Sequence, residues 1–224
     1  MKKSTSLLAI ILMLCINSLA SKEDDDKTQR NQSTTGTATV HSFSGYVNTG
    51  KLKMPEKSDP KEMALEFFEL NREHFHMKNP KEELVLAGVL SDDIITRVTL
   101  KQVYNGVPVD AGTRVFFNNR GELEHIYFTY YDIVDLSPIP QIDSATAENL
   151  ALKDLGFPKD AKVVNNKKRK ASTQLCIWLH QDEKFHLIWV VWVSQDYPEA
   201  HAWQYYIDAH DGTVLKKADR MMRN

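Results

Sequence analysis

The sequence predicts an α+β fold in which two helix-on-antiparallel-sheet units follow one another along the chain. Two stretches, near residues 59–75 and 143–155, show the spacing of amphipathic helices. Each is followed by several apolar runs of strand length, separated by turns rich in Asn, Gly and Asp. One helix is thus available to cover one face of each group of strands, which favours two units in tandem.

The first 20 residues have the features of a secretion signal. Two lysines give a positive start, Leu7 to Ile16 is an apolar run, and Ser18 to Ala20 offers small residues for cleavage. The run is shorter than the roughly 20 residues that a membrane-spanning helix needs. We expect cleavage near Ala20 and a secreted, periplasmic or cell-envelope protein with no transmembrane segment in its mature form.

The cysteines and the net charge bear on membrane anchoring, on thiol chemistry and on nucleic-acid binding. A lipid anchor on Cys15 is the less favoured alternative, because Leu14 stands where a lipobox has a small residue. After cleavage Cys176 is the one remaining thiol, in an apolar run that favours a buried, inert side chain. Without Lys2 and Lys3 the chain has 26 basic and 30 acidic residues, a net charge of −4. We therefore expect no nucleic-acid partner.

Residues 21–58 are expected to form a polar, flexible segment, in which 37–47 alternates weakly and can add a strand. The first folded unit is predicted at 59–137. Its helix begins at Asp59, which can cap the free N–H groups ahead of Pro60 and Glu62. The helix stripe consists of Ala64, Phe67, Phe68, Asn71 and Phe75. Its strands are predicted at 84–90, 97–104, 107–117 and 122–130.

Two turns connect the last three of these strands. Asn105-Gly106 is the strongest short turn signal in the chain, because both positions tolerate positive φ. A second turn is predicted at 118–121, with Gly121 in the same kind of conformation. The three strands are therefore expected to form an antiparallel meander.

The second unit is predicted at 142–216, after a hinge at 138–141, and a tail follows at 217–224. Asp143 or Ser144 caps its helix, and Gly156 ends it. Its strands are predicted at 173–179, 185–193, 201–207 and 213–215. The strand from Phe185 to Val193 is apolar on both faces, which predicts a central strand covered on both sides.

Two segments carry a resemblance to known families. Gln102 to Val109, together with Gly121, resembles the fungalysin/thermolysin propeptide domain. Trp189 and the segment from Tyr205 to Leu215 resemble a PepSY domain. The matching positions are Gln102, Tyr104, Gly106, Val107, Pro108, Gly121, Trp189, Tyr206, Asp208 and Gly212. The order is that of a thermolysin-type metallopeptidase pro-region.

This resemblance implies a fold and a partner. Such pro-regions pack as cystatin-like helix-on-sheet subdomains, and they act as intramolecular chaperones and inhibitors of the linked enzyme. The partner would then be a secreted zinc metallopeptidase. The residues Leu215, Lys216, Lys217 and Arg220 are candidates for a tail that enters its cleft.

The chain itself is predicted to have no catalytic activity, no metal and no cofactor. No H-E-x-x-H sequence occurs, nor a G-x-S-x-G elbow, a P-loop or a dinucleotide fingerprint. The histidines His180, His186 and His210 fall on predicted strands and turns, and we expect no carboxylates or cysteines clustered with them.

Two other readings stay open. The chain can be a general extracellular or envelope binding module of the PepSY type, with exposed aromatic residues among Tyr127, Phe128, Tyr130 and Tyr131 as its surface. It can also be a truncated metallopeptidase precursor whose catalytic domain lies outside this sequence.

Overall fold

The computed structural model describes residues 31–35, 38–46, 51–156, 163–164, 167–168, 170–195 and 201–220. The expected signal peptide and residues 221–224 of the expected tail lie outside the described residues. The helices are α1 (Pro60–Leu70), α2 (Pro80–Glu83) and α3 (Ser144–Asp154). The strands are β1 (Asn31–Thr35), β2 (Ala38–Tyr46), β3 (Leu84–Ser91), β4 (Ile95–Tyr104), β5 (Val107–Asn118), β6 (Leu123–Ile133), β7 (Val163–Val164), β8 (Lys167–Lys168), β9 (Lys170–Leu179), β10 (Phe185–Gln195), β11 (His201–Asp208) and β12 (Val214–Asp219). Within these ranges no helix is long and apolar enough to cross a membrane.

The α+β class is confirmed, with few helices packed on a large sheet. The sheet runs in the order β1-β2-β6-β5-β9-β10-β11-β12, and β3 and β4 attach to it through β5. All neighbouring pairs are antiparallel except β5 and β9, which make a parallel bridge between Val109 and Ile177. The two groups of strands expected from the sequence are thus joined in one hydrogen-bonded network of ten strands.

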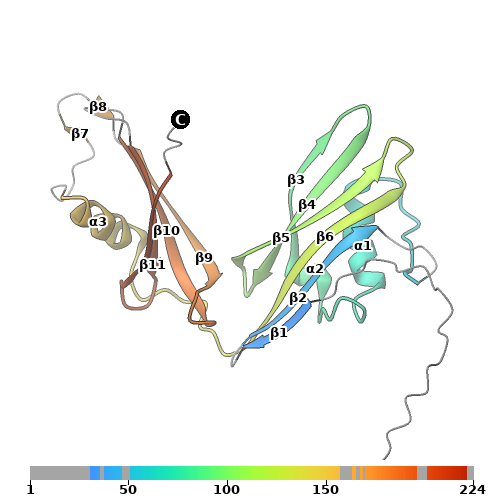
Figure 1. Ribbon diagram of the computed structural model, residues 1–224, viewed down its shortest axis with the longest axis horizontal. Coiled ribbons are helices and arrows are strands. Elements are labelled where there is room, and N and C mark those ends of the chain that lie inside the picture. Colours follow the sequence, from blue (N-terminus) through green and yellow to red (C-terminus); the bar gives the residue numbers. More distant parts are fainter. Residues whose placement is uncertain are drawn as a thin grey trace, which may run out of the picture.

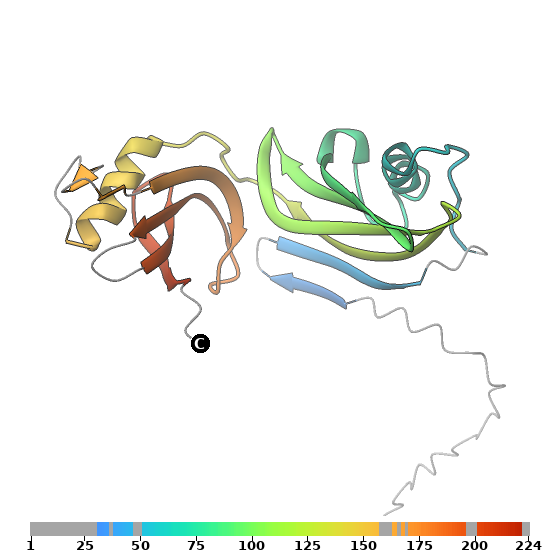
Figure 2. The ribbon, with the colours of Figure 1, turned by 90° about the horizontal axis from the view of Figure 1, so that it is seen from above.

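The molecule has two lobes that diverge from this bridge like the arms of a V (Figure 1). We call α1, α2 and β1 to β6 the first lobe, and α3 with β9 to β12 the second lobe. Seen from above, α1 and α2 lie together against the sheet of the first lobe, and α3 lies at the far end of the second (Figure 2). Each lobe therefore has its helices on one face of its strands.

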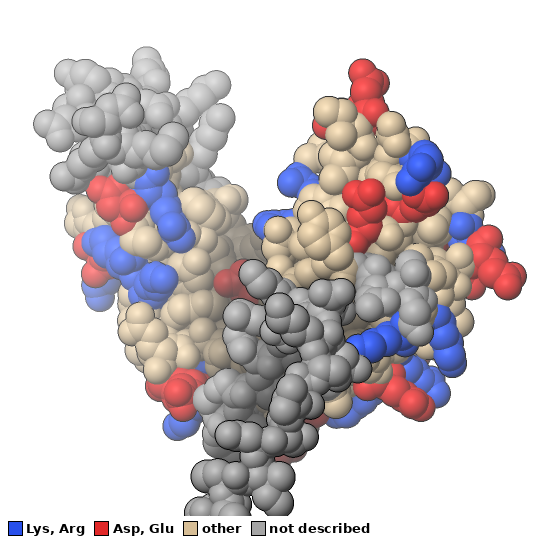
Figure 3. Space-filling model, turned by 45° about the vertical axis from the view of Figure 1, so that its right-hand side comes forward, with Lys and Arg blue, Asp and Glu red and all other residues tan. Residues whose placement is uncertain are grey.

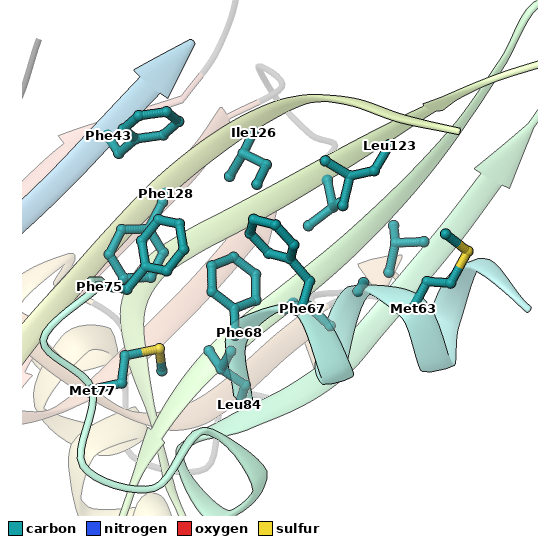
Figure 4. Close-up of a cluster of buried hydrophobic side chains, with 14 of the residues drawn as sticks. Phe43, Met63, Phe67, Phe68, Phe75, Met77, Leu84, Leu123, Ile126 and Phe128 are labelled. Carbon is teal, nitrogen blue, oxygen red and sulfur yellow. The ribbon is translucent and has the colours of Figure 1, made fainter. Parts of the chain in front are cut away.

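Helix α1 begins where the sequence predicts, and its buried face forms the core of the first lobe. The Asp59 Oδ1 atom accepts hydrogen bonds from the backbone N–H groups of Lys61 at 2.8 Å and Glu62 at 3.3 Å. The predicted stripe is confirmed in part. Its residues Ala64, Phe67, Phe68, Asn71 and Phe75 are all buried, but the helix ends at Leu70, so that Asn71 is its C-cap and Phe75 lies in the turn that follows. Figure 4 shows these phenylalanines packed against side chains from β2 and β6.

Asn71 interrupts the apolar stripe for a structural reason. Its amide group donates to the carbonyl oxygens of Phe67 and Lys53, both at 2.8 Å. The Asn71 Oδ1 atom also accepts from the Lys53 N–H group at 2.8 Å. One buried side chain thus satisfies the end of α1 and holds the segment that leads into the helix.

The β4–β5 hairpin has the turn that Asn105-Gly106 predicts. Asn105 has φ 48° and Gly106 has φ 82°, so both are in the left-handed region. Asn tolerates this conformation better than most residues, and Gly adopts it without steric cost.

Replacing Gly106 with alanine is expected to lower the free energy of unfolding by about 1 kcal/mol or more, because a Cβ atom is strained at positive φ. Gly112→Ala is the matched control, since Gly112 lies in the same strand pair without positive φ and with open space at its Cβ position. Thermal and urea unfolding of both variants measures the difference. Equal stability of the two variants would contradict the hairpin.

The second lobe repeats the helix-then-strands order. The Asp143 Oδ1 atom caps α3 by accepting from the Thr146 N–H group at 2.7 Å, and Gly156 ends the turn after the helix with φ 73°. The core under α3 consists of Ala147, Ala151, Leu152, Val191, Val193, Tyr205 and Ile207.

Strand β10 is central in the sheet, as predicted, but only part of the strand is buried on both faces. The strand lies between β9 and β11, and Val191 and Val193 are buried beneath α3. On the opposite face Ile188 is buried, whereas Trp192 is 42% exposed. Coverage on both sides is therefore wrong for the end of the strand, because the described part of the second lobe supplies a helix to one face alone.

Candidate functional site at the junction of the lobes

The propeptide-like motif on β4 and β5 forms the junction between the two lobes. Val107 and Val109 are buried there with Ile177 and Leu187 of the second lobe. Tyr104 packs against the same cluster. Most of the motif therefore contributes to an internal contact, and Gly106, with its positive φ, forms the turn beside it.

Gln102 closes a gap in the sheet at this junction. It is 4% exposed. Its Nε2 atom donates to the Tyr131 carbonyl oxygen at 2.7 Å, and its Oε1 atom accepts from the Tyr131 N–H group at 2.9 Å. The pairing of β5 with β6 covers only the stretch from Arg114 to Phe117 of β5. The side-chain amide thus acts as a substitute backbone partner for Tyr131 after β6 has left β5.

A groove of about 180 Å³ opens beside the junction, with one wall from each lobe. Figure 3 shows the notch between the lobes on the surface. The first lobe contributes Lys101, Pro108, Val109, Asp110 and Ala111, and the second contributes Gln174, Cys176, Ile188, Val190, Trp192, Gln204 and Tyr206. The second wall is the face of β9 to β11 opposite α3.

This wall continues onto an aromatic and basic surface. The rings of Trp178 and Tyr206 lie 4.8 Å apart between centroids. The Lys216 Nζ atom stands 5.7 Å from the first ring and 5.4 Å from the second, within the range of cation–π attraction. Arg220 donates from Nε to the Gln204 Oε1 atom at 2.7 Å. We call Trp178, Trp192, Gln204, Tyr206, Lys216 and Arg220 the open face.

The candidate tail residues are divided by strand alternation. The last strand, expected to end at Leu215, continues to Asp219 and pairs with β11. Lys216 therefore belongs to the open face, whereas Lys217 points to the helix side, where its Nζ atom donates to the Asp154 Oδ2 atom at 2.7 Å. This bond, followed by one from Tyr205, lowers the pKa of Asp154.

The remaining motif residues hold turns and ends of elements. The Trp189 Nε1 group donates to the Ile142 carbonyl oxygen at 2.9 Å and fixes the entry to α3. Gly212 has φ 81°, and a Cβ atom there would lie 3.1 Å from the Leu150 Cδ1 atom. Gly121 has φ 75° in the β5–β6 turn, as expected.

Cys176 lies in the groove wall rather than in a closed core. Burial, and after it the charge of Asp110, raise the pKa of Cys176 to about 12. The thiol is therefore protonated at neutral pH, which makes it a poor nucleophile.

The aromatic residues proposed for a binding surface separate into three environments. Tyr127 is 46% exposed, on the face of the first lobe away from α1, where its ring lies 4.5 Å from that of His125. Phe128 and Tyr130 are buried in the first lobe, and Tyr131 packs at the junction. A shared surface of all four tyrosine and phenylalanine side chains is therefore not formed.

The expectation that the histidines stand apart from carboxylates is wrong. His186 on β10 lies between two aspartates, with Nδ1 2.8 Å from Asp208 Oδ2 and Nε2 3.2 Å from Asp182 Oδ2. His180 Nδ1 is 3.0 Å from Asp182 Oδ1, and His210 Nδ1 is 3.6 Å from Asp208 Oδ1. The β9–β10 turn and the β11–β12 turn meet at one end of the sheet, which brings together residues far apart in sequence.

In this cluster the charged form of His186 and the ionised form of Asp182 stabilise each other. Partial burial disfavours a charged His186, but hydrogen bonds with Asp208 and Asp182 outweigh it and raise the pKa of the imidazole. Burial likewise opposes ionisation of Asp182, yet hydrogen bonds, with His186 first among them, lower its pKa to about 2.

Comparison with known proteins supports the expected resemblance in part. A scan against models of protein families finds no match. Over 176 residues the chain is 24% identical to a bacillolysin of Brevibacillus brevis, a match that covers 75% of this chain and 33% of the bacillolysin. The chain thus spans about a third of the length of this curated relative.

Two of the solved structures that match this chain have low structural similarity to it. One is the YpeB C-terminal domain of Bacillus megaterium, with 12% identity, a TM-score of 0.36, and coverage of 88% of this chain and 92% of that domain. The other is a putative lipoprotein of Clostridium difficile, with 14% identity, a TM-score of 0.25, and coverage of 74% and 96%.

Proposed function

We propose that this protein is an exported, non-catalytic module that binds a thermolysin-type zinc metallopeptidase and inhibits it or assists its folding. The observation that carries the proposal is the similarity to bacillolysin, which covers 75% of this chain but only 33% of that protein. A shared part of this size fits a pro-region, in agreement with the motifs at 102–109 and 205–215. If the chain is a pro-region, its two lobes correspond to two cystatin-like units in tandem.

The open face and the groove beside it are the surface that we assign to the peptidase. Trp192 is 42% exposed at the edge of the groove, and large aromatic side chains at such positions dominate many interfaces. Strand β12 ends the described sheet, so its outer backbone groups can pair with an extended segment of a partner. Lys216 and Arg220 add positive charge beside it, which favours an acidic segment.

The direct test is a titration of the chain from Ser21 onward into a purified, folded bacillolysin-type peptidase. We expect a dose-dependent loss of chelator-sensitive proteolysis with a stoichiometric endpoint. A parallel assay adds the chain to unfolded peptidase and measures the recovered activity, which separates folding assistance from inhibition. The proposal fails if neither assay responds and no complex is seen by size-exclusion chromatography.

Trp192→Ala is expected to weaken the complex about 30-fold or more, the effect of losing an interface residue worth about 2 kcal/mol. The matched control is Leu90→Ala, which removes an apolar side chain that is 62% exposed on β3, away from the groove. Binding is measured by calorimetry with both variants. A larger loss in the control would assign the interface to the β3 edge instead.

The second candidate is a general envelope binding module, which the exposed Trp192 and Tyr127 would also permit. Such a module would leave the peptidase unaffected in both assays. A truncated precursor is distinguished at the level of the gene, by reading the frame beyond Asn224 for an H-E-x-x-H helix.

A further inference from the structure

We propose that His180, Asp182 and His186 form a binding site for a divalent transition-metal ion of the zinc class. The site lies at the β9–β10 turn, at one end of the second lobe's sheet. Each residue offers one ligand atom, and the three atoms all lie within 4.8 Å of one another. This site shares no residue with the groove or with the open face used in the proposed function, but it adjoins the open face, because the His180 ring lies 5.0 Å from that of Trp178.

The spacing of the ligand atoms fits a tetrahedral ion. Asp182 Oδ1 is 3.0 Å from His180 Nδ1, and Asp182 Oδ2 is 3.2 Å from His186 Nε2. Ligands on a tetrahedral zinc ion with bonds of about 2.0–2.2 Å stand about 3.4 Å apart. Each imidazole is therefore near this spacing from one oxygen of the carboxylate. Binding through a single oxygen needs a rotation of the carboxylate and the rings that brings the three ligand atoms, now within 4.8 Å of one another, to the tetrahedral spacing.

The turn that holds these ligands is well defined. The His180 N–H group donates to the Lys184 carbonyl oxygen at 2.9 Å, and Glu183 reverses the chain with φ 63°. The Lys184 N–H group donates to Asp182 Oδ1 at 3.1 Å, which orients the carboxylate toward the two imidazoles. The geometry thus follows from backbone contacts, independently of any ion.

Asp208 supports His186 in the way that carboxylates support metal-binding histidines. Its side chain is 12% exposed, and Asp208 Oδ2 lies 2.8 Å from His186 Nδ1. The His210 N–H group donates to Asp208 Oδ1 at 2.8 Å and holds the carboxylate in place. When the ion displaces the proton that Nε2 shares with Asp182 and releases it to solvent, the proton kept between Nδ1 and Asp208 leaves the Nε2 lone pair for the ion, the arrangement found around ligating histidines.

The negative charge of the cluster and its exposure to solvent also favour the binding of an ion. Two neutral imidazoles with the carboxylates of Asp182 and Asp208 carry two negative charges, which one divalent ion balances. The side chains of His180, His186 and Asp182 are 23%, 20% and 40% exposed, so the site opens to solvent. Two nitrogen ligands favour zinc, copper or nickel over calcium and magnesium, which prefer oxygen alone.

The test is calorimetric titration of Zn²⁺ into the full, tag-free chain, first stripped with chelator and then freed of it. We expect one ion per chain. His186→Gln and Asp182→Asn should each weaken binding at least tenfold, and Asp208→Asn, which removes no ligand, should weaken it about 10- to 100-fold. Co²⁺ in place of Zn²⁺ should give the strong visible absorption of a tetrahedral site.

Two controls make the outcome decisive. His74→Gln removes an exposed histidine of the first lobe and should leave zinc affinity unchanged. Circular dichroism checks the fold of every variant, and Asp182→Asn decides the matter if His186→Gln is misfolded, because Asp182 lies in an exposed turn. The proposal is overturned if the wild-type chain binds no stoichiometric zinc, or if Asp182→Asn binds it as tightly as the wild type.

Discussion

Replacing Phe67 with alanine is expected to lower the free energy of unfolding by about 3–5 kcal/mol, the usual cost of removing a buried phenylalanine. Phe67 is 0% exposed, and its ring lies 5.5 Å from that of Phe68 and 5.7 Å from that of Phe75. The cavity would open between α1 and the sheet, where close packing leaves little room for collapse. Denaturant unfolding followed by far-ultraviolet circular dichroism measures the loss.

Leu70→Ala is the control for Phe67→Ala, because it shortens a side chain of the same helix that is 38% exposed. We expect a loss of about 1 kcal/mol or less there, since partial exposure leaves less area to lose. Similar losses in the two variants would show that the α1 face does not form the core.

The same experiment reports on the coupling of the lobes. All four tryptophans, Trp178, Trp189, Trp192 and Trp203, belong to the second lobe. Tryptophan fluorescence therefore follows the second lobe while circular dichroism follows the whole chain. Because Val107 and Val109 share a buried cluster with Ile177, we expect the two signals to shift together in Phe67→Ala.

Replacing Gln102 with leucine is expected to lower the free energy of unfolding by about 2–4 kcal/mol, because it leaves two partly buried backbone groups of Tyr131 without their partners. Each unsatisfied group costs about 1–3 kcal/mol. Both hydrogen bonds are short, at 2.7 and 2.9 Å. Urea unfolding measures the loss. Gln174→Leu is the matched control, since Gln174 is exposed, and it should change stability by less than about 0.5 kcal/mol. Equal effects in both variants would show that the Gln102 bonds do not stabilise the junction.

Local signals predicted most of the secondary structure correctly, because they depend on neighbours in the sequence. Asp59 and Asp143 cap α1 and α3 as expected, and Asn105-Gly106 turns the β4–β5 hairpin. Helix α2 was not predicted, since its 4 residues are too few for a periodic pattern. The strand at β2 was correctly expected inside an otherwise polar segment.

The histidine cluster was missed because its local signal is weak and the rest of it comes from a distant part of the sequence. The ligands His180, Asp182 and His186 are close in sequence, but their spacing matches no zinc motif, and their support comes from Asp208 on another strand. The register of β10 against β11 places Ile188 opposite Asp208. This register brings the Asp208 carboxylate to hydrogen-bond distance from His186. The H-x-D-x-x-x-H spacing across a tight turn was the one signal in the sequence that pointed to it.

The sequence by itself determined the α+β class, the starts of α1 and α3 and the hairpin turns, since capping, periodicity and positive φ act within a few residues. It also carried the resemblance to a pro-region, through the segments 102–109 and 205–215. Only the tertiary structure decided three further features. Gln102, Val107 and Val109 of the first of these segments are buried at the junction of the lobes, and the end of β10 is exposed at Trp192 on the face opposite α3. Three histidines also meet aspartates at one end of the sheet. These depend on strand order and register, which bring together residues that no sequence window contains.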